Sequence, residues 1–202
     1  MNIGVFLSAS NLDELYTQPT REFGELIGRA GHTLVWGGFD TGLIKVLTDG
    51  VQASGGRLAG ISVDSPRKWA RKDADEMTFA MDLAERKARL LTVSDARAVM
   101  PGGVGTLDKA TEVLELRKHG LYDQPVVPRN TAGFYGGLIL QLRRMDEQGF
   151  LPLPLAQLVF IADTAAGALA YLEKSVGTDD GTVTARLPAR QIAPTPAGPP
   201  GN

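Results

Sequence analysis

The chain has 202 residues and a mass of 21.5 kDa, which suits one domain of ordinary size, with or without a tail. Its 21 Lys and Arg residues against 23 Asp and Glu residues give a formal charge of −2, so no overall basic field attracts nucleic acid or anionic lipid. With no Cys and two His, the sequence excludes a disulfide framework, a thiolate nucleophile and a Cys-based or His-rich metal site.

The sequence also shows no pattern typical of an export signal or of a membrane-spanning segment. The opening residues MNIGVFLSAS lack a basic region, and no run approaches about 18 apolar residues. We therefore expect a cytoplasmic protein with no membrane or nucleic-acid partner, no metal and no cofactor.

Short apolar runs alternate with longer helix-compatible segments, which is the pattern of βαβ units and predicts an α/β fold with a mainly parallel sheet. The expected strands are Ile3–Leu7, Thr33–Gly37, Arg57–Ser62, Ala96–Pro101, Gln124–Pro128 and Gln157–Ile161, with a weaker extended stretch near Met77–Phe79. The expected helices are Pro19–Ala30, Thr41–Ser54, Met81–Ser94, Thr106–His119, Gly133–Gln148 and Thr164–Ser175.

The composition changes near Val176, beyond which five of the 12 Pro residues fall and little apolar surface remains. We expect residues 1–175 to form the folded domain and residues 176–202 a disordered, solvated tail. The alternative for the tail is a polyproline interaction motif at PTPAGPP.

The most informative segment is Pro101-Gly102-Gly103-Val104-Gly105-Thr106, between an expected strand and an expected helix. Glycines allow backbone N–H groups to approach an anion, and a helix start adds unpaired donors and a positive dipole end. The segment therefore predicts a phosphate site, although such turns also serve packing. It matches neither the Walker A ending nor the GxGxxG fingerprint.

Two further turns follow expected strands and should reach the same edge of the sheet, where ligands bind at a topological switch point. They are Ser8-Ala9-Ser10 and the glycine turn from Gly37 to Gly42. The serine hydroxyls suit a phosphate or a ribose, and equally a helix cap or a local turn. Trp36 and Phe39 suit base stacking or, more commonly, packing.

A cationic pair, Arg86-Lys87, lies on the helix that precedes the strand of the glycine segment. The planar fork of Arg86 suits bidentate recognition of phosphate or carboxylate, whereas the alternative is a solvated surface charge.

Together these motifs make the chain resemble the LONELY GUY (LOG) family of cytokinin-activating proteins, long labelled possible lysine decarboxylases. Arg86-Lys87, Ser94-Asp95-Ala96 and PGGVGT keep the order of that family's motifs. The segments GVFLSAS, LVWGGFDTGLIKVLTDGV and GLYDQPVVPRNTAGFYGGLILQLRRMDEQGFL extend the resemblance over about Asn2–Lys174. A lysine decarboxylase reaction gains no support from the residues, because a pyridoxal enzyme needs a Schiff-base Lys with matching partners.

The resemblance implies a Rossmann-like, three-layer α/β/α fold and a homodimer with active sites near the subunit interface. It implies a nucleoside 5′-monophosphate substrate, cleaved to a free base and ribose 5-phosphate. The residues that it assigns to phosphate or substrate binding are Ser8, Gly38, Arg86, Lys87, Gly102, Gly103, Gly105 and Thr106, with Arg86 also the cation of the catalytic site.

One departure from the resemblance affects catalysis. The family pattern PGG-x-GT-x-x-Glu ends on a catalytic carboxylate, and Lys109 occupies that position here. A protonated Lys opposes the positive charge of an oxocarbenium-like transition state. Glu112, one helical turn onward, is the candidate for a surviving carboxylate, and the alternative is a Lys109–Glu112 ion pair.

Milder departures from the family pattern are Leu83-Ala84 and Lys45, which lie where the resemblance expects the base or ribose pocket. His119 suits a helix C-terminus.

Three hypotheses follow for function. The first is a nucleoside monophosphate N-glycosidase, the second a non-catalytic nucleotide-binding protein, and the third an enzyme diverted to another phosphorylated substrate, with Lys109 binding an extra anionic group.

Overall fold

The computed structural model of the chain describes residues 1–63 and 70–177. Of the expected tail, residues 176 and 177 belong to the last helix, α7 (Ala165–Gly177), and the remainder lies outside the described residues.

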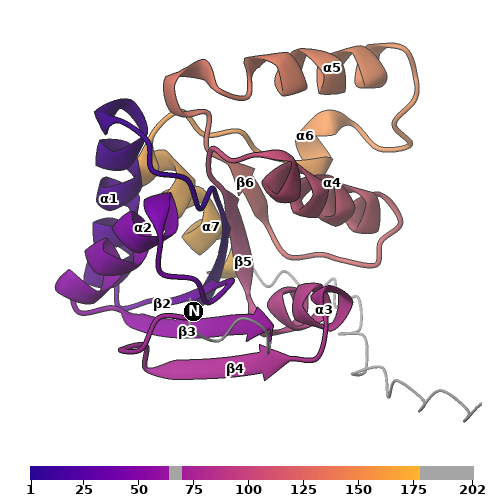
Figure 1. Ribbon diagram of the computed structural model, residues 1–202. Coiled ribbons are helices and arrows are strands. Elements are labelled where there is room, and N and C mark those ends of the chain that lie inside the picture. The colour runs from indigo at the N-terminus through magenta and orange to yellow at the C-terminus, as the bar shows by residue number, and fades with distance from the viewer. Residues whose placement is uncertain (64–69, 178–202) are drawn as a thin grey trace, which may run out of the picture.

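A six-stranded, fully parallel sheet forms the middle layer (Figure 1). Its spatial order is β4-β3-β2-β1-β5-β6. The strands are β1 (Asn2–Phe6), β2 (Thr33–Trp36), β3 (Arg57–Val63), β4 (Glu76–Ala80), β5 (Ala96–Val99) and β6 (Val126–Pro128). The predicted α/β fold with a mainly parallel sheet is confirmed, and the weak stretch near Met77–Phe79 is the edge strand β4.

Helices cover both faces of the sheet, which gives three layers (Figure 1). One face carries α1 (Glu14–Arg29), α2 (Gly42–Ala53) and α7. The other carries α3 (Leu83–Val93) and α4 (Val104–Lys118), with α5 (Gly136–Glu147) and the short α6 (Leu155–Leu158) beside them, and a 3-10 turn, η2 (Thr131–Gly133), follows β6.

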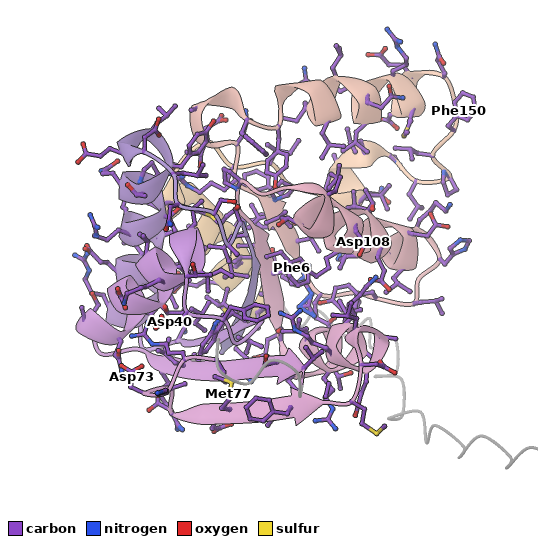
Figure 2. The ribbon with its side chains drawn as sticks, in the orientation of Figure 1. Phe6, Asp40, Asp73, Met77, Asp108 and Phe150 are labelled. Carbon is purple, nitrogen blue, oxygen red and sulfur yellow. The ribbon has the colours of Figure 1, made fainter. Side chains whose placement is uncertain are left out.

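The alternation of side chains along each strand divides the core into two clusters. On β1, Ile3 and Val5 pack with α1, α2 and α7, whereas Phe6 packs with Leu90 of α3 and Val113 of α4. All five of these side chains are nearly or fully buried. Phe6, near the centre of the molecule (Figure 2), therefore marks the place where β1 ends under α3 and α4.

The direction of the chain across the sheet reverses beside β1. After β1 the chain proceeds outward through β2, β3 and β4, and then returns to form β5 on the other side of β1. The connection after β1 therefore leads toward β2, and the connection after β5 leads the opposite way, toward β6. Such a reversal leaves a crevice at the carboxyl edge of the sheet.

The expected strand Gln157–Ile161 is wrong. Pro154 precedes a helical turn, α6, that takes up Leu155–Leu158, and the next residues run beside β6 with only an isolated bridge between Arg129 and Ala162. The expected start of the first helix at Pro19 is also wrong. The helix begins five residues earlier, at Glu14, because Asp13 caps it by accepting a hydrogen bond from the amide of Leu15.

Candidate functional site

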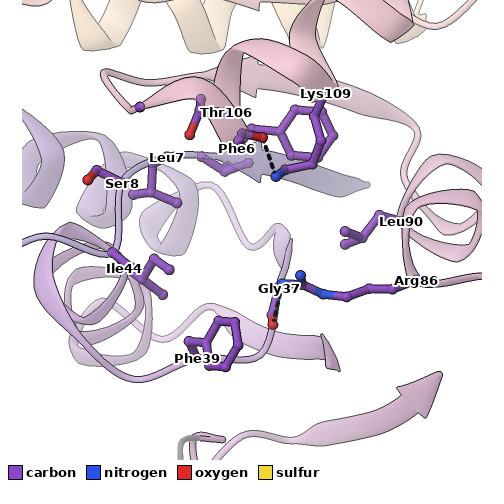
Figure 3. A pocket seen from close by; sticks show the side chains of 14 residues that line it. Phe6, Leu7, Ser8, Gly37, Phe39, Ile44, Arg86, Leu90, Thr106 and Lys109 are labelled. Carbon is purple, nitrogen blue, oxygen red and sulfur yellow. Dashed lines mark hydrogen bonds between the residues drawn. The ribbon is translucent and has the colours of Figure 1, made fainter. Parts of the chain in front are cut away.

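A cavity of about 260 Å³ lies at the carboxyl ends of β1 and β2, against the start of α4 (Figure 3). Its walls come from the turn after β1, the glycine turn after β2, one face of α3 and the first turns of α4. The three turns that the sequence predicts to converge do meet here, because parallel strands end at one edge of the sheet.

The start of α4 presents unpaired backbone donors beside this cavity. Gly103 caps the helix without a side-chain hydrogen bond, and its carbonyl oxygen accepts from the amides of Thr106 and Leu107. The amides of Val104 and Gly105 donate to no acceptor among the described residues, as expected for the first positions of a helix. This helix start can receive an anion.

The glycines of the PGGVGT segment have different roles. A Cβ on Gly102 would lie 2.2 Å from Thr106 Oγ1, so Gly102 is required by packing. A Cβ on Gly103 or Gly105 would meet nothing within 4 Å. Their openness leaves the backbone accessible to a ligand.

The turn after β1 is tied to both neighbouring turns through the backbone. The amide of Ser8 donates to the carbonyl oxygen of Pro101 at 3.1 Å, and the amide of Leu43 donates to that of Ser10 at 3.1 Å. Ser8 Oγ lines the cavity and accepts a hydrogen bond from the Ser10 amide at 3.1 Å, which is a local turn contact.

Arg86 reaches from α3 into the opposite wall (Figure 3). Its Nη2 donates to the carbonyl oxygen of Gly37 at 2.7 Å and its Nε to that of Ile61 at 2.9 Å, while its guanidinium lies 5.4 Å from the centre of the Phe39 ring. Burial lowers the pKa of Arg86. No carboxylate of the described residues pairs with this guanidinium, so its charge is available to a ligand.

The glycine turn after β2 fits closely around these contacts. A Cβ on Gly37 would lie 1.9 Å from Arg86 Nη2, so a larger residue there would displace the Arg86 guanidinium. Gly38 has a φ of +81° and packs on Ser62 beneath the cavity wall.

Arg71, which the sequence analysis did not single out, anchors this turn from outside the cavity. Its amide donates to the Gly38 carbonyl oxygen at 2.9 Å, and its buried guanidinium binds Asp40 at 3.1 Å and Asp49 at 2.7 Å. Asp73 completes the cluster, and Figure 2 shows it at the same corner of the molecule as Asp40. Asp40 and Asp49 lie 31 and 22 residues from Arg71 in the chain, so no local sequence pattern indicates this role.

Lys109 lines the cavity at the end where Arg86 lies (Figure 3). Its Nζ donates back to the carbonyl oxygen of Gly105 and lies 5.7 Å from the centre of the Phe6 ring. Burial, and then repulsion from Arg86, lower the pKa of Lys109.

The carboxylates of α4 are engaged elsewhere. Lys87 of α3 pairs with Glu112 at 2.8 Å and with Asp108 at 3.1 Å, outside the set of cavity-lining residues. The ion pair of Glu112 is thus with Lys87, across two helices, and not with Lys109.

Six of the residues predicted for phosphate binding, substrate binding or catalysis line the cavity together: Ser8, Arg86, Gly103, Gly105, Thr106 and Lys109. Gly38, Lys87, Gly102 and Glu112 lie behind or beside it. The apolar wall from Phe6, Ile44 and Leu90 was missed, because each also fits an ordinary core position of its element.

The remaining candidates have structural contacts. Trp36 is fully buried and donates to the Phe39 carbonyl oxygen at 3.0 Å, whereas Phe39 lines the cavity. Lys45 pairs with Asp49, and His119 pairs with Glu115 at the end of α4.

Among the described residues, no three His, Asp or Glu side chains gather in a way that would hold a metal ion. None of the helices in that part of the chain has the length and apolar character needed to cross a membrane.

Comparison with curated proteins gives consistent relatives. A cytokinin riboside 5′-monophosphate phosphoribohydrolase of Arabidopsis thaliana is 31% identical over 143 residues, 70% of this chain and 66% of the relative. One from Mycobacterium tuberculosis is 30% identical over 169 residues, 83% of this chain and 90% of the relative. A probable one from Oryza sativa subsp. japonica is 29% identical over 157 residues, and the chain spans just under two thirds (64%) of its length.

Solved structures share the fold. A molybdenum cofactor binding protein from Rippkaea orientalis superimposes with a TM-score of 0.65 at 18% identity, covering 86% of this chain and 95% of that one. The molybdenum cofactor carrier protein of Chlamydomonas reinhardtii gives 0.64 at 22% identity, covering 87% and 97%. These similarities show a common Rossmann-like architecture.

The family model described as "possible lysine decarboxylase" matches residues 44–172, which begin just after the glycine turn and include Arg86 and the PGGVGT segment. With the phosphoribohydrolase relatives, this match confirms the resemblance noted from the sequence: the chain belongs to the possible lysine decarboxylase family that includes the LOG phosphoribohydrolases.

Proposed function

We propose that the chain binds a nucleoside 5′-monophosphate in the cavity and hydrolyses its N-glycosidic bond. The C–N bond to the base breaks, and water supplies the oxygen of the new C–O bond. One water proton goes to the base nitrogen, and the other stays on the new hydroxyl group of the ribose. The products are the free base and ribose 5-phosphate. The single observation that carries this proposal is the unpaired helix start of α4 facing Arg86 across one cavity.

Each wall has a task in this reaction. The amides at Gly103, Val104 and Gly105 receive the phosphate, helped by the positive end of α4. The Ser8 hydroxyl and Thr106 border the same end. Arg86 is held in place by two carbonyl oxygens and supplies a fixed cation where the sugar and base lie. The names of the relatives support a nucleoside monophosphate as substrate.

A second candidate function is nucleotide binding without hydrolysis. It is favoured by the composition of the cavity wall, which contains Arg86 and Lys109 and no carboxylate among the described residues. Positive charge that develops on the ribose is opposed by both cations, and Glu112 is paired with Lys87. Binding would survive this arrangement, whereas turnover requires that the positive charge be offset.

Incubation with a panel of purine and pyrimidine nucleoside 5′-monophosphates separates the two candidates. We expect the wild type to release free base and ribose 5-phosphate, measured by chromatography, and Arg86→Ala to lose this activity. Binding by calorimetry without base release, together with base release by Lys109→Glu, would instead establish the second candidate. Absence of both binding and release in the wild type would refute both.

We further propose a cytoplasmic homodimer with its cavities near the subunit interface, and a folded unit that ends near residue 175. Support for the dimer comes from the family resemblance. Light scattering after size exclusion tests the assembly, since a monomer at micromolar concentration would contradict it.

A further inference from the structure

The side of the cavity between Lys109 of α4 and Arg86 of α3 carries uncompensated positive charge. In Figure 3, Ser8 and Thr106 lie toward one end, and Lys109 and Arg86 toward the other, with Leu90 on the wall between those two cations. Lys109 is half-buried and donates only to the Gly105 carbonyl oxygen, so two of its three N–H groups have no partner among the described residues. Arg86 Nη1 likewise donates to no described residue.

The nearest carboxylates do not neutralise this pair. Asp108 and Glu112 lie on the same helix as Lys109, but both bind Lys87 at 3.1 and 2.8 Å. Figure 2 shows Asp108 on α4, and neither carboxylate belongs to the cavity wall. The cationic end therefore has no protein counterion within ion-pair distance among the described residues.

A third cation lies behind the wall. Arg97 of β5 is fully buried, donates to the Leu90 carbonyl oxygen at 2.9 Å, and has no partner for Nε or Nη1. Its guanidinium is 5.6 Å from the centre of the Phe6 ring, and Lys109 Nζ is 5.7 Å from the same ring. Phe6 thus contacts two cations, one buried and one facing the cavity, which makes an anion at this end more favourable.

We propose that the preferred ligand of this cavity is a nucleotide with a second acidic group, a carboxylate or phosphate on its base or sugar side, which binds between Lys109 and Arg86. This inference rests on the proposed function, because the 5′-phosphate occupies the helix start of α4. It assigns Lys109 to specificity: the residue selects doubly acidic nucleotides over simple monophosphates.

The same contact resolves the electrostatic conflict of the hydrolysis reaction. An acidic group between Lys109 and Arg86 compensates their charge, so that positive charge developing on the ribose is no longer opposed by two bare cations. The ligand then supplies the negative charge that the cavity wall lacks.

Matched nucleotides test the inference by calorimetry at one ionic strength. Orotidine 5′-monophosphate differs from uridine 5′-monophosphate by one carboxylate on the base, and adenosine 3′,5′-bisphosphate differs from adenosine 5′-monophosphate by one phosphate on the sugar. We expect the doubly acidic member of at least one pair to bind about tenfold or more tightly than its partner, the size of one charge-assisted hydrogen bond. Adenosine 5′-diphosphate, whose extra charge extends the phosphate chain, should gain less.

Three variants identify the residue responsible. Lys109→Gln should bring the ratio within each pair close to one while monophosphate binding persists, and Lys109→Arg should retain the preference. Lys118→Gln makes the same charge change near the end of the same helix, where Lys118 pairs with Glu115, and should leave the ratio unchanged. Circular dichroism checks that each variant is folded.

The outcomes separate this inference from the proposed function. Equal binding of both members in both pairs, or a preference that Lys109→Gln leaves intact, would overturn the inference while monophosphate binding still stands. Failure of the wild type to bind any of these nucleotides would overturn both.

Discussion

Lys87 Nζ lies 2.8 Å from a carboxylate oxygen of Glu112, a contact that joins α3 to α4 beside the cavity. The pair draws Glu112 toward α3, while Lys109, three residues earlier, folds back toward Gly105 and faces the cavity. Lys109 and Glu112, about one turn apart on α4, therefore face different surroundings. The Glu112 carboxylate faces α3, whereas the Lys109 ammonium group faces the cavity, where a ligand would contact it.

Arg86 is expected to serve binding and wall structure together. Arg86→Ala removes the donors to Gly37 and Ile61 and should weaken nucleotide binding by about tenfold or more, because hydrogen bonds to charged groups are worth about 1.5 to 3 kcal/mol each. Arg86→Lys keeps the charge without the fork and should recover only part of the affinity. Calorimetry with a nucleoside monophosphate measures both, and full affinity in Arg86→Ala would contradict this role.

Substitutions at two glycines of the site separate an effect on nucleotide binding from an effect on packing. Gly105→Ala places a Cβ in open space within α4, so it should stabilise the protein by about 0.5 to 1 kcal/mol while reducing phosphate access. Gly37→Ala puts its Cβ 1.9 Å from Arg86 Nη2 and should both destabilise the protein and displace Arg86. Urea unfolding and nucleotide titration of the two variants separate the effects. Unchanged binding in Gly105→Ala would remove its amide from the phosphate site.

Replacement of Arg71 should destabilise the fold around the glycine turn. Arg71→Gln leaves Asp40, Asp49 and Asp73 without their buried partner, at a cost of about 2 to 3 kcal/mol at pH 7. Lys45 still pairs with Asp49 and limits the loss. The measurement is the free energy of unfolding in urea.

The effect of Arg71 should depend on pH in a defined direction. Burial opposes ionisation of Asp49, but hydrogen bonds from Lys45 and Arg71 outweigh it and hold the pKa of Asp49 below 3.8. Arg71 likewise outweighs burial and lowers the pKa of Asp73 below 3.8. Their contribution is therefore complete above pH 3.8 and is lost as the pH falls through the lowered values. The gap between wild type and Arg71→Gln should shrink below that pH, and a constant gap would exclude this origin.

Tyr135 positions the strand end before the PGGVGT segment. Its buried hydroxyl donates to the Met100 carbonyl oxygen at 2.7 Å, and burial raises its pKa. Tyr135→Phe leaves that oxygen unpaired and should lower the free energy of unfolding by about 1 to 3 kcal/mol. Nucleotide affinity should change less than in Arg86→Ala, since the ring still packs in place, and a larger loss of affinity than of stability would indicate a direct role.

Much of the fold follows from local pattern. Strands such as β2 and β5 are short, mostly apolar runs before glycine-containing turns, and buried parallel strands favour such runs. The segment Gln157–Ile161 has the same apolar character, but Pro154 begins a helical turn there, and burial of Leu158 and Val159 accounts for the apolar residues. Periodicity alone does not distinguish a short buried strand from a helical turn.

The candidate site was predictable where the backbone dictates its shape and where the family resemblance assigned side chains such as Arg86. The glycine turns and the start of α4 follow from residue type, because a Cβ is excluded or because helix amides stay unpaired. The partner of Glu112 did not follow, since Lys87 reaches it from another helix. The unpaired charge of Arg97 was equally hidden, because it depends on which side of β5 packs on Phe6 and Tyr122.

The backbone links from Ser8 to Pro101 and from Ser10 to Leu43 have a consequence for how this molecule can diversify. Main-chain atoms form the outline of the cavity at these turns. Substitutions there leave its shape unchanged as long as the two backbone hydrogen bonds are preserved. A new preference among small molecules must then arise at side chains on the cavity wall, of which half-buried Lys109 is the least tied to the core.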